Sequence, residues 1–237
     1  MFGVSTCCLQ HTPLSAALEQ LETVTDTVEV VDGGLHFLDG PDILETFSFR
    51  YFIHAPARSV NIASLLTPIR RASVEVITRC FEIAAEADAG VVVHPGYCAW
   101  QEVREAAIGQ FRISLEELKI AADERSVTFF MENMPNWGHF FLRTPDELPM
   151  LDGVGLALDV GHAHTNGCLE HWIEYPAAHY HLHDNNGNED AHTAVGDGTI
   201  DFAPVMEAVR RNSPATPVIE VATFEGAIRS IEALRRL

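Results

Sequence analysis

At residues 156–162 the chain reads Leu-Ala-Leu-Asp-Val-Gly-His. A short apolar run ends in a carboxylate, Asp159, and a histidine, His162, follows three positions later. Short apolar runs of this kind are typical of strands that are buried in a parallel sheet. Both polar side chains are of types that bind metal ions. The segment therefore predicts a buried strand that ends at a site, with His162 close enough to reach the same site.

Short apolar runs and amphipathic segments alternate from one end of the chain to the other. Helical periodicity is clearest at 69–87, 102–124, 202–211 and 225–237. The predicted strands are 2–7, 27–31, 51–54, 91–94, 127–132, 155–159, 179–184 and 217–221. Strands that are separated by helix-length segments form parallel βαβ units rather than hairpins. Eight such units in 237 residues predict an α/β fold, a closed (β/α)8 barrel.

The competing fold is an open, doubly wound sheet. Such a sheet normally carries a glycine-rich phosphate turn after its first strand, and the sequence at that point is Cys7-Cys8-Leu9-Gln10. We see no linker, repeat or low-complexity segment. We therefore expect residues 1–237 to form one TIM-barrel domain.

The composition is that of a globular protein. Apolar residues make up 47% of the chain, which can therefore bury a sizeable core. No apolar run reaches the roughly 20 residues of a bilayer-spanning helix, and the first residues lack the basic and apolar regions of a signal peptide. The five cysteines are odd in number and form no CxxC pair, which favours free thiols in a reducing compartment. We expect a cytoplasmic protein with no membrane association.

The charge of the chain bears on its partners. The net charge is −19, and only one of the fifteen basic residues is a lysine, Lys119. Proteins bind nucleic acid largely through Lys and Arg side chains that displace counterions from the phosphates. A surface this negative repels a phosphate backbone. The composition therefore disfavours a nucleic-acid partner and favours a small-molecule substrate.

Each of the last six predicted strands ends in a side chain of metal-ligand type. In a barrel the carboxyl ends of the strands meet on one face, so these side chains converge on one pocket. Carboxylates and imidazoles that are crowded into an apolar mouth are costly to desolvate unless a cation is present. The pattern therefore predicts a divalent metal. The six residues are His54, His94, Glu132, Asp159, His181 and Glu220.

Two loops bring the number of predicted metal ligands to nine. His162 follows Asp159, and the segment after the seventh strand contains Asp190 and His192 before a tight Val-Gly-Asp-Gly turn at 195–198. A single histidine at a strand end is more often a hydrogen-bonded structural residue, and a single carboxylate there is often a helix N-cap. Six consecutive strand ends of ligand type favour metal binding over these alternatives.

Taken together, these residues resemble the xylose-isomerase-like barrel superfamily, which contains endonuclease IV and the sugar isomerases and epimerases. The resemblance covers nearly the whole chain. It rests on His-Ala-Pro at 54–56, His-Pro-Gly at 94–96, Glu-Asn at 132–133, Asp-Val-Gly-His at 159–162, His-Leu-His-Asp at 181–184, Asp-Ala-His at 190–192, Gly-Asp-Gly at 196–198 and Ile-Glu at 219–220.

The resemblance implies two models of the site. In endonuclease IV nine such residues hold three zinc ions, and all nine positions have a counterpart of the same type here. In the ketohexose 3-epimerases one metal, usually manganese, is held at the positions that match Glu132, Asp159, His181 and Glu220, and the two glutamates also move protons. The chain departs from both models. Gly187 stands where the epimerases carry a substrate-binding arginine, and the chain is compact and acidic where the endonuclease has basic loops.

We expect a metal-dependent isomerase or epimerase of a small sugar or sugar phosphate. A zinc or manganese centre of one to three ions would chelate adjacent carbonyl and hydroxyl oxygens and stabilise the ene-diolate that forms on deprotonation. Glu132 and Glu220 are the expected base and acid on opposite faces of the substrate. The expected substrate contacts are His183, Arg58, Arg143 and Trp137, with the arginines available for a phosphate.

Two alternatives stay open. The first is metal-assisted hydrolysis of a phosphodiester, in which a cluster lowers the pKa of a bridging water towards about 7. The full set of nine ligands favours hydrolysis, whereas the net charge argues against DNA as the substrate. The second is a catalytically silent binding protein, which would leave the two glutamates without a purpose.

Overall fold

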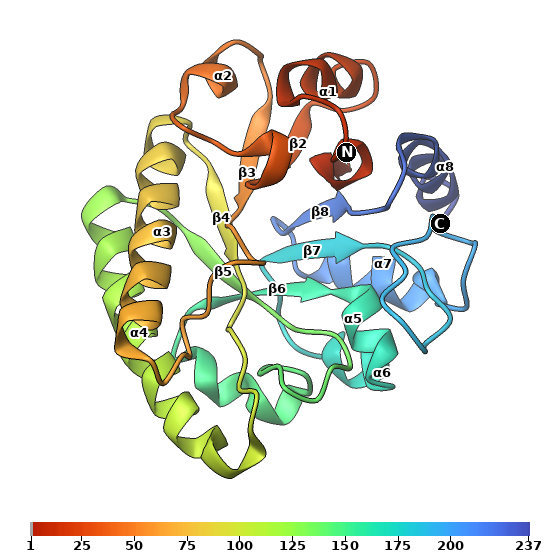
Figure 1. Cartoon of the computed structure of the whole chain (residues 1–237). Helices are drawn as coiled ribbons and strands as arrows, with labels where there is room; N and C mark the ends of the chain where they lie inside the picture. The colour runs from red at the N-terminus through yellow and green to blue at the C-terminus, as the bar shows by residue number, and fades with distance from the viewer. Residues whose placement is uncertain (1) are drawn as a thin grey trace.

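Eight parallel strands close into one barrel in the order in which they occur along the chain (Figure 1). The computed structural model describes residues 2–237, so the first residue of the predicted domain lies outside the described residues. The closed barrel confirms the predicted fold. Its strands are β1 (Gly3–Ser5), β2 (Thr27–Val31), β3 (Arg50–His54), β4 (Gly90–Val93), β5 (Phe129–Glu132), β6 (Gly155–Asp159), β7 (His179–Leu182) and β8 (Thr216–Ile219).

All eight strands were predicted, and the differences lie at their ends. The first strand was expected to reach residue 7, but it stops at Ser5, whose hydroxyl accepts the Cys7 N–H at 3.2 Å and caps the 3-10 helix η1 (Thr6–Leu9). The seventh strand was expected to reach residue 184. It stops at Leu182, because Asp184 leaves the barrel ladder and pairs with Thr193 through two backbone hydrogen bonds of 2.9 and 3.0 Å.

The four predicted helices are present with ends that differ by up to three residues. They are α3 (Thr67–Glu86), α4 (Arg104–Arg125), α7 (Phe202–Arg211) and α8 (Phe224–Leu234). The periodicity did not reveal the shorter elements, which span too few residues to display a helical repeat. These are α1 (Leu14–Leu21), α2 (Asp42–Glu45), α5 (Val160–Thr165) and α6 (Leu169–Trp172), with the 3-10 helices η2 (Gly34–His36), η3 (Gln101–Val103) and η4 (Pro145–Leu151).

The short elements explain how a barrel fits into this chain. Between β5 and β6 the full-length helix of a usual βα unit is replaced by η4, which contains Pro145 and Pro149. A proline inside a helix removes a backbone donor and clashes with the preceding turn. α3 and α4 are the longest helices and lie side by side along one flank of the barrel (Figure 1).

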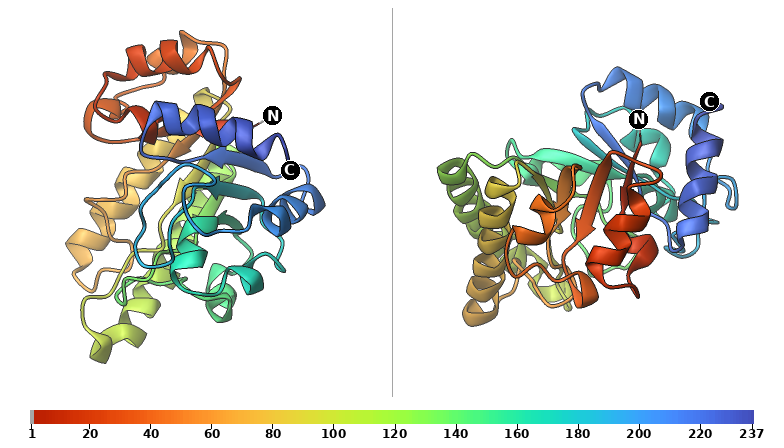
Figure 2. Two further views of the ribbon diagram at one scale, coloured as in Figure 1. Left: turned by 90° about the vertical axis from the view of Figure 1, so that its right-hand side faces the viewer. Right: turned by 90° about the horizontal axis from the view of Figure 1, so that it is seen from above.

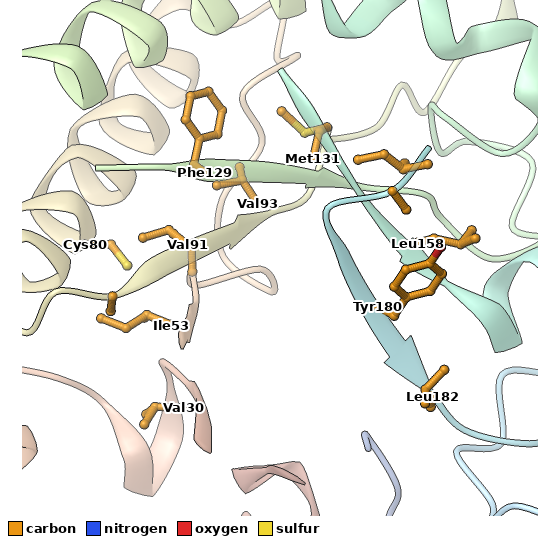
Figure 3. Close-up of a cluster of buried hydrophobic side chains, with 14 of the residues drawn as sticks. Val30, Ile53, Cys80, Val91, Val93, Phe129, Met131, Leu158, Tyr180 and Leu182 are labelled. Carbon is orange, nitrogen blue, oxygen red and sulfur yellow. The ribbon is translucent and has the colours of Figure 1, made fainter. Parts of the chain in front are cut away.

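Side-chain alternation along the strands separates an outer core from the barrel interior. Outward residues such as Ile53, Val91 and Leu158 pack in the main hydrophobic cluster between the strands and the helices (Figure 3). The neighbouring positions Phe52, Val92, Phe130 and Ala157 form a separate apolar cluster. Because side chains alternate with a period of two, the residue two positions after Phe52 or Phe130 also faces inward, nearer the carboxyl end. Those residues are His54 and Glu132. The strand alternation that buries the core therefore also points these candidate ligands into the carboxyl end of the barrel, its mouth.

The closure of the barrel brings the two ends of the chain close together. β1 pairs with β8, and α8 packs on η1, so the first and last elements lie together (Figure 2). Across residues 2–237, the helices are all too short or too polar to cross a bilayer.

Candidate metal centre

The carboxyl ends of the strands surround a cavity of about 660 Å³. Seven of the nine predicted ligands line it, namely His54, His94, Glu132, His162, Asp190, His192 and Glu220. The other two, Asp159 and His181, are fully buried next to them. The structure therefore brings all nine predicted ligands to one place, on one side of the barrel.

Among the described residues, the side chains gather into four groups whose ligand atoms lie within 4.8 Å of one another. Three of these groups include residues that line the cavity, and the fourth, Glu29 with His179 and His181, is fully buried. The central group contains Glu132, Asp159, His181 and Glu220. A second group contains His54 and His94 and shares Glu132 with the central group. The third group contains His162, His183, Asp190 and His192.

The second group shows why a cation is needed. Nδ1 of His54 lies 3.0 Å from the carbonyl oxygen of Ala55, and a carbonyl can only accept, so the ring hydrogen is on Nδ1. A neutral His54 then turns its Nε2 lone pair towards Oε2 of Glu132 at 3.2 Å and towards Nε2 of His94 at 3.2 Å. Lone pairs that face one another repel. The arrangement is stable when a proton or a metal ion lies between them.

The third group repeats this arrangement. Nδ1 of His162 donates to the carbonyl oxygen of Asn133 at 2.8 Å, and Nδ1 of His192 donates to that of Glu220 at 2.9 Å. Both Nε2 atoms therefore point inward, at 3.1 and 3.2 Å from the same oxygen, Oδ2 of Asp190. Two imidazole nitrogens and one carboxylate oxygen that are held in this way fit the ligand set of a divalent transition metal such as zinc.

In the metal-free protein, protons take the place of that cation. Burial alone would lower the pKa of His54, but its hydrogen bond to Glu132 and the charge of that carboxylate raise it to about 9. The pKa of His192 is likewise raised to about 9 against the effect of burial, by the hydrogen bond to Asp190 and the charge of Glu220. Burial alone would raise the pKa of Glu132, but the charges of His94 and His181 hold it well below its usual range.

We expect added metal to raise the melting temperature of the chelator-treated protein, and to raise it more at pH 8.5 than at pH 6.5. The pKa values of His54 and His192 are about 9 in the folded protein and about 6.5 in the unfolded chain. The stability that their protonation provides is therefore complete below about pH 6.5 and is lost as the pH rises through about 9. A metal ion binds in place of these protons, so it binds more strongly at a pH at which the histidines lose them.

At a thousandfold excess over its dissociation constant, a metal stabilises the fold by about 4 kcal/mol, which corresponds to roughly 8–16 °C for a chain of this length. The measurement is a melting curve with and without zinc, manganese, iron or cobalt at the two pH values. The absence of a shift with all four metals would contradict the proposed metal binding.

Asp159 has two roles, one for each oxygen. Its Oδ1 caps α5 by accepting the His162 N–H at 2.6 Å and also lies 3.1 Å from Nε2 of His183. Its Oδ2 is buried without a hydrogen-bond partner in residues 2–237 and lies 3.7 Å from Nδ1 of His181. An unpaired carboxylate oxygen in a buried site is costly, and a metal in the central group would satisfy it. Asp159 can therefore cap α5 through Oδ1 and still offer Oδ2 to a metal ion.

His183 is held beneath α5, the helix that carries His162. It is fully buried, and a Cβ at Gly161 would come within 1.9 Å of its Cε1, so only glycine fits at that position. Its ring stacks on His192, with centroids 4.0 Å apart and planes at 12°. The sequence suggested that His183 contacts substrate, but the structure places it among the ligands of the third group and away from the cavity surface.

The loop that carries Asp190 and His192 is anchored by Asp184, which was not predicted as a site residue. Oδ2 of Asp184 accepts the N–H groups of Gly196 and Gly198 at 2.9 and 3.0 Å, and Oδ1 accepts that of Ile200 at 3.1 Å. A Cβ at Gly198 would come within 2.3 Å of Oδ1. The glycine turn that the sequence showed at 196–198 thus closes on a buried carboxylate and fixes the loop over the site.

Of the other three predicted substrate contacts, one lines the cavity and two do not. Arg58 is exposed, lines the cavity and is the one Arg or Lys among the described residues that do so. Trp137 and Arg143 do not line it. Trp137 packs edge-on against Phe140, with ring centroids 4.7 Å apart, and Nε of Arg143 donates to Asn166 at 3.2 Å.

Glu29 is a polar residue of the barrel interior that the sequence analysis missed. It lies in β2 within Thr-Val-Glu-Val-Val and is fully buried, where Oε2 is 2.8 Å from Nε2 of His179. Burial alone would raise the pKa of Glu29, but the charge of His181 and the hydrogen bond with His179 lower it. The only signal in the sequence was one carboxylate inside an otherwise apolar run.

The fold and this mouth define a TIM-barrel protein with histidine and carboxylate groups of metal-ligand type at the carboxyl ends of its strands. A family model described as "xylose isomerase-like TIM barrel" matches residues 42–237, and the chain belongs to that family. Endonuclease IV and sugar epimerases are among its homologues.

Three similar proteins illustrate the range of the family. An uncharacterized protein of Methanocaldococcus jannaschii, MJ1614, is 35% identical over 210 residues, which are 84% of each chain. A probable endonuclease 4 of Mycobacterium leprae is 28% identical over 212 residues, which are 82% of this chain and 81% of that one. A solved structure of a D-tagatose 3-epimerase-like protein has a TM-score of 0.90 and 29% identity, covering 99% of this chain and 96% of that one.

Proposed function

We propose that this protein is a metal-dependent isomerase or epimerase of a small sugar or sugar phosphate. The observation that carries the proposal is the central group, in which two glutamates, one aspartate and one histidine converge in a buried site next to an open cavity. When it is bound there, a divalent cation supplies Lewis-acid stabilisation of the negative charge that develops on a substrate oxygen. The high structural similarity to a D-tagatose 3-epimerase-like protein supports this assignment.

Glu132 and Glu220 are the proposed proton-transfer groups. Glu132 contacts Nδ1 of His181 at 3.0 Å through Oε1, and Glu220 contacts the same nitrogen at 3.3 Å through Oε2. Both glutamates also line the cavity. One carboxylate takes a proton from a substrate carbon, and the other delivers a proton to the neighbouring position or to the opposite face.

Arg58 is the proposed contact for an anionic substituent such as a phosphate. Among the described residues it is the one Arg or Lys that lines the cavity, which is also lined by four carboxylates. An arginine binds phosphate with paired, charge-assisted hydrogen bonds. Arg58 is therefore the residue on which binding of a sugar phosphate, as opposed to a neutral sugar, would depend.

The test is solvent deuterium incorporation, detected by NMR, over a panel of ketoses, aldoses and their phosphates. The protein is loaded with zinc or manganese, and a phosphodiesterase assay is run with the same preparation. An isomerase or epimerase that transfers a proton through an exchangeable carboxylate places deuterium on a substrate carbon. Phosphodiester turnover without exchange on any sugar would overturn the proposal.

The second candidate function is metal-assisted hydrolysis of a phosphodiester. The specific observation in its favour is that the second and third ligand groups lie beside the central one, as two or three metals would require. Adjacent metals clamp the attacking and leaving oxygens of an in-line displacement. The 28% identity to a probable endonuclease 4 is consistent with this alternative. Three equivalents of zinc in protein purified without chelator would favour hydrolysis, and one of manganese would favour isomerisation.

We expect no useful binding of duplex DNA at physiological salt. The net charge is −19, and within residues 2–237 Arg58 is the one Arg or Lys that lines the cavity. A protein that makes few phosphate contacts releases few counterions and gains little affinity. The measurement is a salt titration with a duplex that contains an abasic site. A nanomolar dissociation constant that weakens steeply with salt would show that this expectation is wrong.

A further inference from the structure

The carboxylate of Glu29 lies below the candidate ligands, in the interior of the barrel. A buried carboxylate is costly to desolvate unless it is paired. Two histidines of β7 provide the pairing, with Nε2 of His179 at 2.8 Å from Oε2 and Nε2 of His181 at 2.9 Å from Oε1. All three side chains are fully buried. Glu29 therefore connects β2 to the histidine at the centre of the ligand groups.

The two ring nitrogens of His181 face different partners. Nδ1 faces the central group, 3.0 Å from Glu132 and 3.3 Å from Glu220. Nε2 of His181 lies 2.9 Å from Oε1 of Glu29, and neither atom has a hydrogen-bond partner elsewhere in residues 2–237. Carboxylates accept hydrogen bonds, so those near Nδ1 and the one near Nε2 each favour a hydrogen on the nitrogen they face. When a metal takes the place of the hydrogen on Nδ1, the remaining ring hydrogen lies on Nε2, where Oε1 of Glu29 is the nearby acceptor. In that tautomer Nδ1 offers its lone pair to a metal.

We infer that Glu29 is a positioning residue of the metal centre, whose carboxylate is braced by His179 and fixes the ring and tautomer of His181 so that Nδ1 faces the metal. His179 occupies the second oxygen of Glu29, and its ring packs between Phe52 and Phe130, with centroids 4.6 and 5.6 Å away. The inference rests on the proposed metal centre and not on which reaction the centre performs. Partners that orient a metal-ligating histidine typically contribute 10–100-fold to metal affinity.

The test is zinc binding to Glu29→Gln, measured by competition with a chelator. Glutamine keeps the size of the side chain but loses the charge, and its NH2 group has to face one of the two Nε2 atoms. We expect one equivalent of zinc to bind about 10–100-fold more weakly, while binding at the third group is unchanged. In protein with 15N-labelled histidine, the Nε2–H signal of zinc-bound His181 should weaken or shift in the variant.

His179→Gln tests the contribution of His179. Its amide can still donate to Oε2 of Glu29, so a smaller loss of zinc affinity than in Glu29→Gln is expected. Glu29→Asp keeps the charge and should retain more zinc affinity than Glu29→Gln, and it serves if the glutamine variant folds poorly.

A purely structural role for Glu29 would lower the melting temperature of the metal-free protein in the variants and leave zinc affinity unchanged. That result would overturn the inference while leaving the proposed function intact. If the wild-type protein bound no metal, the metal centre itself would fail, and the inference with it.

Discussion

Glu132→Gln is expected to remove metal from two ligand groups at once and to lower the reaction rate by at least about 10²–10⁴-fold. Glu132 is shared, since Oε2 lies 2.8 Å from Nε2 of His94 and Oε1 lies 3.0 Å from Nδ1 of His181. Glutamine has one carbonyl oxygen and one NH2 group, so it cannot offer an anionic oxygen to both sides. An NH2 group that faces an imidazole lone pair also occupies the position that a metal would take.

The measurement is elemental analysis of the purified variant together with turnover on the substrate that the exchange panel identifies. Asp190→Asn is the matched control, because its carboxylate belongs to the third group alone. We expect that control to lose metal only from the third group. A Glu132→Gln protein that keeps its full metal content and its activity would contradict the assignment of Glu132 as a shared ligand.

The convergence of nine candidate ligands could be predicted from the sequence because a barrel fixes where strand ends lie. Once the apolar run before Asp159 is recognised as a strand, its last residue must face the mouth, and the same holds for Glu132 and His54. His94 and Glu220 lie one residue beyond the ends of β4 and β8, and this small shift still leaves them at the cavity.

Contacts that depend on the middle of a strand or on a loop path could not be predicted in this way. Glu29 sits inside an apolar strand, and its partners are 150 and 152 residues away in the chain, at His179 and His181. Asp184 was visible only as the end of a predicted strand, because its role depends on the backbone of a turn that closes over it. Arg143 and Trp137 lie in loops, whose direction strand registers do not determine.

Glu220→Gln is expected to separate the two candidate reactions, because it alters a group that moves a proton in one and only binds metal in the other. Glu220 lies just beyond β8, lines the cavity and is 6% exposed. Glutamine keeps its shape and one coordinating oxygen but is not basic. In an isomerase, loss of a general base lowers the rate by about 10²–10⁴-fold, and deuterium exchange at the substrate carbon should fall in parallel while much of the metal is retained.

In a hydrolase no carbon-bound hydrogen moves, so the wild-type protein shows no exchange. The activity of Glu220→Gln then falls only as far as the variant loses metal. Glu225→Gln, an exposed position on α8, carries the same chemical change away from the cavity and is expected to match the wild type in both assays. The decisive comparison is the ratio of exchange rate to bound metal in the two variants. If Glu220→Gln keeps that ratio at the wild-type value, Glu220 holds metal and does not transfer the proton. A large fall at nearly full metal content is the result that proton transfer by Glu220 requires.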